Sequence, residues 1–146
     1  MEIITRFDEV VELARMRAPV YVRYSAGPAH DAEAPSHDVE ADVALPGPPA
    51  ATLTPEPWWT RPDEDWVARR LCTYLDPLEQ DGNGADRRPW LLTGVVVGYG
   101  PEHEPLIGAV EPLGWVGPEV LETAKELYRS QFHSLGDPTD PKQKSA

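Results

Sequence analysis

The sequence contains one cysteine, few basic residues and no long apolar run. Because Cys72 is alone, no disulfide can form within the chain, which excludes disulfide-stapled scaffolds. Lys and Arg number 13 against 25 Asp and Glu, a net charge of -12, and such a field repels phosphate backbones and anionic lipid surfaces. The most apolar stretch, residues 90–97, is far shorter than the roughly 20 residues that span a bilayer. We therefore expect no nucleic-acid partner and no membrane partner.

The composition that is present is typical of one globular domain. A chain of 146 residues that is 40% hydrophobic and carries five tryptophans can bury a core of its own. We expect a single domain over residues 1–136, followed by a polar, disordered tail over residues 137–146. The first residues lack the basic start and apolar stretch of a secretory signal, so the expected location is the cytoplasm.

Residues 27–65 form a segment rich in proline and acid. It contains nine Asp and Glu residues, and Arg61 is its only Lys or Arg. A segment of this composition cannot collapse by itself, so we expect an irregular insert. The pair Trp58-Trp59 lies within it, and paired tryptophans indicate that part of the insert packs. Two short apolar islands, residues 39–45 and 50–53, could add an edge strand or simply lie across the core.

Three segments have the spacing of amphipathic helices. The first begins after a Thr5 cap and ends before Pro19, and the second begins near Thr60 and is expected to stop at Asp76-Pro77. The third begins at Gly117-Pro118, with Gly136 beyond its end.

Residues 20–24, 90–97 and 106–110 predict strands. In the first, Val20, Val22 and Tyr24 lie on one face and Tyr21, Arg23 and Ser25 on the other, which indicates one buried and one mixed face. The near-continuous apolar run at 90–97 predicts a central strand buried on both faces. This order of elements predicts an α+β fold, in which about three helices pack on a small, largely antiparallel sheet.

Five stretches of the chain carry a resemblance to a known family. They are residues 21–25 (YVRYS), 55–59 (PEPWW), 66–72 (WVARRLC), 90–94 (WLLTG) and 100–106 (GPEHEPL). Together they resemble a family of small actinobacterial proteins of unknown function. This resemblance implies no activity, substrate or cofactor.

A second resemblance concerns a possible enzyme site. Arg23 on a strand beside Ser25, with Glu104 near a later strand, is similar in outline to mono-ADP-ribosyltransferases. The resemblance implies that Arg23 would help to hold NAD and that Glu104 would orient the reacting ribose. In the alternative interpretation, Arg23 pairs with one of the many carboxylates and Glu104 lies in a solvated loop.

Metal chemistry has little support in the sequence. His30-Asp31 and His37-Asp38 are close together, and His103 lies between two glutamates, but the spacing matches no defined metal motif. We assign no metal site and no cofactor.

The two neighbouring tryptophans favour a binding function. Trp58 and Trp59 lie between Pro57 and Pro62, and rigid aromatic side chains on a restrained loop are common on recognition surfaces. The alternative is that one or both cover the core. The sequence thus predicts a binding or interaction module for a protein or small molecule, with the NAD-using enzyme as the alternative.

Overall fold

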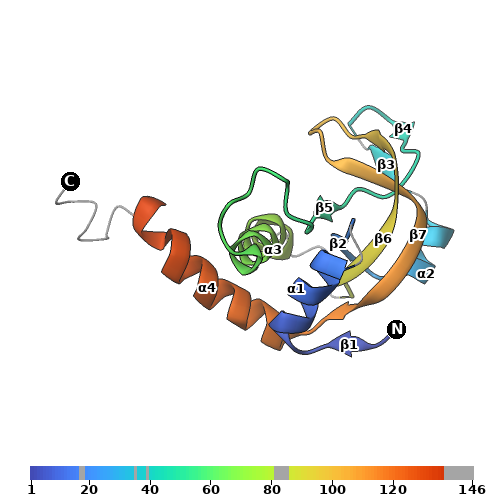
Figure 1. Ribbon diagram of the computed structural model, residues 1–146. Helices are drawn as coiled ribbons and strands as arrows, with labels where there is room; N and C mark the ends of the chain where they lie inside the picture. The colour runs from blue at the N-terminus through green and yellow to red at the C-terminus, as the bar shows by residue number, and fades with distance from the viewer. Residues whose placement is uncertain (17–18, 35, 39, 81–85, 137–146) are drawn as a thin grey trace.

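The computed structural model describes residues 1–16, 19–34, 36–38, 40–80 and 86–136 (Figure 1). The expected tail over residues 137–146 lies outside the described residues. Within the described part, no helix is both long and apolar enough to cross a membrane.

A curled five-stranded sheet forms the centre of the fold, with the strand order β1-β7-β6-β2-β5. The strands are β1 (Ile3–Ile4), β2 (Tyr21–Ser25), β5 (Ala51–Thr52), β6 (Arg88–Tyr99) and β7 (Pro105–Val116). Among the described strands of this sheet, β1 alone runs parallel to its neighbour, β7, and the other pairs are antiparallel. The predicted α+β class and the largely antiparallel sheet are confirmed, and β6 lies in the middle as expected.

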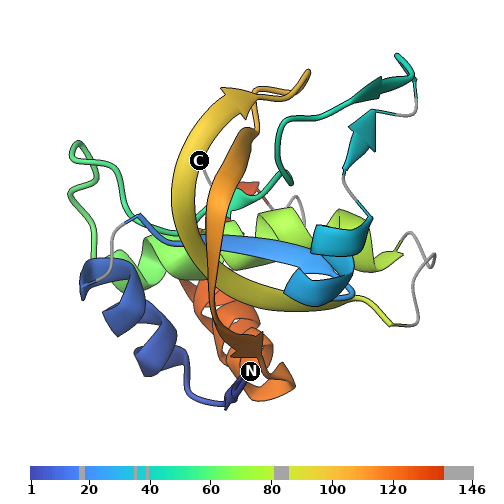
Figure 2. The ribbon, with the colours of Figure 1, turned by 90° about the vertical axis from the view of Figure 1, so that its right-hand side faces the viewer.

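Three helices lie on one side of this sheet: α1 (Phe7–Met16), α3 (Asp63–Gln80) and α4 (Pro118–Gly136) (Figures 1 and 2). The apolar face predicted for the first helix is buried as a set, namely Phe7, Val10, Val11 and Ala14. These side chains join Val20 and Val22 of the strand face in the main core. The other face of the sheet carries a smaller cluster around Tyr21 and Trp90.

The insert over residues 27–65 contains more regular structure than its composition predicts. It forms the short helix α2 (Pro28–Glu33), a separate two-stranded sheet of β3 (His37–Asp38) and β4 (Val43–Ala44), and the edge strand β5. Helix α2 lies beside β2, on the side of the sheet away from the three longer helices (Figure 2). Each of these elements is short, because the prolines leave few consecutive backbone donors.

Two sequence predictions about these elements were wrong in extent. β6 is buried at Trp90, Leu91 and Leu92, but Val95 and Val97 are 60% and 47% exposed, because the outer half of the β6–β7 hairpin projects beyond the helices (Figure 1). Helix α3 continues through Asp76-Pro77 to Gln80. A proline near the end of a helix removes one backbone hydrogen bond, and a long helix already packed along its length tolerates that loss.

Candidate functional site

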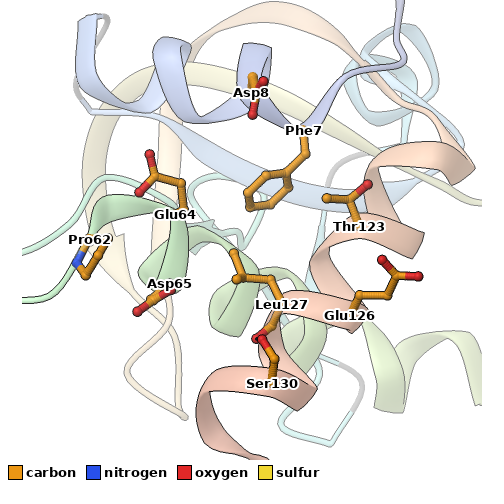
Figure 3. Close-up of a pocket in the computed structure, with 9 residues that line it drawn as sticks. All are labelled: Phe7, Asp8, Pro62, Glu64, Asp65, Thr123, Glu126, Leu127 and Ser130. Carbon is orange, nitrogen blue, oxygen red and sulfur yellow. The ribbon is translucent and has the colours of Figure 1, made fainter.

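A groove of about 640 Å³ lies where α1, α3 and α4 meet. Phe7 of α1 and Leu127 of α4 point toward one another at its centre (Figure 3). Carboxylates from all three helices surround this apolar centre: Asp8, Glu64, Asp65 and Glu126. The groove therefore combines an apolar floor with an acidic rim.

The positions of these residues follow from the local helix structure. Phe7 is the first residue of α1, and its ring points toward the first turn of α3 (Figure 3). Glu64 and Asp65 lie in that turn, where acidic side chains complement the positive end of the helix dipole. On α4, Thr123, Leu127 and Ser130 are spaced by three or four residues and therefore share one face.

Basic side chains lie beside three of the four carboxylates of the acidic rim, and one of these contacts is an exposed Arg6–Asp8 pair at 3.7 Å. Arg15 bonds Asp63 at 2.9 Å and Glu64 at 2.8 Å, which ties α1 to α3. The hydrogen bond to Asp63 is the largest cause of the raised pKa of Arg15. Arg61 lies 3.2 Å from Asp65, whose side chain is 6% exposed. Glu126 is exposed on α4, and the described lining of the groove contains no Lys, Arg or His.

The predicted aromatic pair lies on the loop that leads into the groove. Trp58, Trp59 and Trp66 form three edge-to-face contacts with ring centroids 5.1 to 6.2 Å apart. The Trp59 indole nitrogen donates to the carbonyl of Pro62, a residue that lines the groove. Trp66 packs against the main core, whereas Trp58 is 69% exposed. Trp59 and Trp66 thus act as the anchor, and Trp58 is presented to solvent.

The residues of the enzyme hypothesis are only partly brought together. Arg23 and Ser25 line one pocket with Asp31 at the free edge of β2. Glu104 lines a neighbouring pocket with Glu102 and also accepts a hydrogen bond from the Glu102 backbone. His37 contributes to both pockets.

The side chains of Arg23 and Ser25 are largely committed to structural contacts. Arg23 Nε lies 2.6 Å from Asp31 Oδ2, and Arg23 also donates to the Pro49 carbonyl. Ser25 Oγ donates to Asp31 and accepts from Trp90 Nε1 at 2.9 Å. Ser25 is 5% exposed and its Oγ also accepts from the Gly27 backbone, so both lone pairs of this oxygen are occupied and the group is arranged as a structural hydroxyl.

Metal ligation has no geometric basis among the described residues, because no three His, Cys, Asp or Glu side chains are grouped so that they could hold an ion.

The groove between the three helices was not predicted from the sequence. Its floor, Phe7 and Leu127, reads as ordinary core positions in the sequence, and only the acids in the first turns of α1 and α3 gave a local signal.

Comparison with known proteins gives a family but no activity. A family model described as "Family of unknown function (DUF6098)" matches residues 1–137. No curated protein and no solved structure matches the chain. The predicted resemblance to a family of unknown function is confirmed at that level, while the actinobacterial source and the ADP-ribosyltransferase analogy stay predictions.

Proposed function

Since the chain belongs to this family of unknown function, we propose a function from the site itself: the protein is an interaction module that binds a basic, amphipathic segment of a partner protein. The segment would lie in the groove between α1, α3 and α4. The observation that carries the proposal is the apolar pair Phe7 and Leu127 enclosed by four carboxylates (Figure 3).

The chemistry of the groove selects the occupant. An amphipathic helix places its apolar side chains in a groove and leaves its polar face at the rim. Lys and Arg on that face would complement Glu126, and would compete with Arg6 for the exposed Asp8. The net charge of -12 would accelerate the encounter with a basic partner. An acidic or uncharged partner gains nothing from such a rim.

Trp58 extends the proposed surface. Large exposed aromatic side chains are frequent energetic centres of interfaces, provided that they are held in place before binding. Contacts with Trp59 and Trp66 provide this restraint. The shared turn at Pro62 joins the tryptophan cluster to the groove, which supports one continuous binding face.

The enzyme alternative is less well supported. Its two strand residues, Arg23 and Ser25, are bound to Asp31, and Glu104 lines the neighbouring pocket. An NAD site would require these three groups to face one reacting centre.

A dye-labelled peptide of Leu and Lys in helical amphipathic order tests the proposal by fluorescence anisotropy. We expect binding to the wild-type chain, with affinity reduced about 3- to 10-fold in Glu126→Arg, because a rim charge is reversed. Glu33→Arg is the matched control: it makes the same charge change at an exposed site of α2, away from the described lining of the groove. Equal binding of a scrambled peptide, or equal losses in the two variants, would contradict the proposal.

A further inference from the structure

A second pocket, of about 380 Å³, lies at the edge of β2. Strand β5 pairs with Tyr21 and Val22, and among the described residues no strand pairs with the following part of β2 on that side. Helix α2, strand β3 and α3 contribute the surrounding side chains. The polar part of the described lining includes Arg23, His30, Asp31, His37, Tyr74 and Arg87.

Arg23 and Asp31 form a rigid base for this pocket. Their side chains are 13% and 11% exposed, and the ion pair measures 2.6 Å. Arg23 Nη2 lies 3.4 Å from the second oxygen of Asp31, and Nη1 donates to Pro49. These contacts involve three of the five N–H groups of the guanidinium. The arginine is therefore held in position before any ligand arrives.

The charge of the pocket opposes that of the whole chain. Asp31 is the one carboxylate in its described lining, and Arg23 already neutralises it. Arg87, His30 and His37 remain as cationic or hydrogen-bonding groups, although His37 also lies 3.0 Å from Asp42. On a protein with a net charge of -12, this is a local site that favours an anion.

We propose that this pocket binds a small phosphate monoester. Arginine and histidine side chains donate to phosphate oxygens, and a monoester carries about -1.5 to -2 charges near neutral pH, which suits this set better than a carboxylate does. Leu45, Pro49 and Tyr74 supply apolar surface for the organic group of the ligand. The volume of about 380 Å³ lies in the range of small-molecule sites.

The proposed pocket is separate from the protein-binding groove. Tyr74 lies about three helical turns along α3 from Glu64 of the groove. Failure of either proposal therefore leaves the other unaffected. Because both lone pairs of the buried Ser25 hydroxyl already accept hydrogen bonds, from Gly27 and Trp90, the pocket is assigned a binding role and no chemical step.

Phenyl phosphate is the probe, followed by amide and histidine NMR signals of the full chain. We expect saturable shifts around Arg23, His30 and Arg87, and binding about tenfold weaker in Arg87→Ala, because one charge-assisted contact is lost. Arg129→Ala is the control, since it removes an equal charge from an exposed position on α4. His30→Gln provides a second exposed variant, with an expected loss in the same direction.

Three results would overturn the assignment. One is the absence of saturable shifts in these residues. Another is an equal loss of binding in Arg87→Ala and Arg129→Ala, which would indicate attraction to basic residues in general. The third is tighter binding of benzoate than of phenyl phosphate, which would contradict the choice of a phosphate ligand.

Discussion

The Trp90 indole nitrogen donates a 2.9 Å hydrogen bond to Ser25 Oγ, and both residues are buried. The same hydroxyl donates to Asp31 and accepts from the Gly27 backbone. One serine thus links the middle strand of the sheet to the Arg23–Asp31 ion pair and to the start of α2. This link explains why a proline-rich insert stays attached beside β2.

Ser25→Ala should therefore destabilise the fold more than the removal of a single oxygen atom would suggest. The change leaves the buried indole N–H of Trp90 without its acceptor, and an unsatisfied buried donor costs about 1–3 kcal/mol. Urea unfolding measures the loss. Ser130→Ala, which removes an exposed hydroxyl from α4, should cost far less, and equal losses would show that the Ser25 network contributes little.

The Arg23–Asp31 pair should show strong coupling in a double-mutant cycle. Arg23→Met or Asp31→Leu alone leaves a nearly buried charge without its partner, at a cost of about 2–4 kcal/mol. The double variant should lose clearly less than the sum of the two, because no unpaired charge remains. Additive losses in chemical unfolding would contradict the coupling.

Loss of the Tyr74 hydroxyl proton at alkaline pH should destabilise the fold. Burial is the main cause of the raised pKa of its hydroxyl, while Arg23 acts in the opposite direction. The folded state therefore holds this proton more tightly than the unfolded state does. The associated stability is complete below pH 10.0, the ordinary value, and is lost as the pH rises through the raised pKa.

Tyr74→Phe should flatten this decline in unfolding free energy above pH 10.0. Some decline will persist, because burial also raises the pKa of Tyr21. Tyr21→Phe removes that second contribution and serves as the comparison. An unchanged pH profile in Tyr74→Phe would contradict the assignment.

Replacing the two neighbouring tryptophans should lower the stability of the fold by different amounts. Trp58→Ala should lower the unfolding free energy by less than about 1 kcal/mol, because the side chain is 69% exposed. Trp59→Ala loses a hydrogen bond and the ring contact with Trp66, and should cost about 1–3 kcal/mol. Thermal or urea unfolding measures both, and similar losses would mean that Trp58 is as structural as Trp59.

Local patterns were sufficient to predict the main elements of the fold. The spacing of Phe7, Val10 and Val11 predicted the buried face of α1, and the alternation in residues 20–25 predicted the two faces of β2. Local patterns do not predict features that depend on contacts between residues far apart in the sequence. β1 has two residues and is stabilised by pairing with β7, and the outer half of β6 is exposed because no helix reaches it.

The candidate site was predictable only in part. Trp58 and Trp59 were recognised from their proline-flanked loop, and Arg23 from its strand. The groove was not, because Phe7, Glu64 and Glu126 belong to three helices far apart in sequence and meet only through packing. The composition of the insert gives no sign that Ser25 holds α2 through Asp31.

The most direct test of the proposed function is to locate the amphipathic Leu and Lys peptide on the ¹⁵N-labelled protein by NMR titration. We expect the largest saturable shifts on Phe7, Asp8 and Leu127 and on the Trp58 indole, with little change at the β6–β7 hairpin. Shifts centred on the exposed Val95 and Tyr99 of that hairpin, or scattered evenly over the acidic surface, would contradict it.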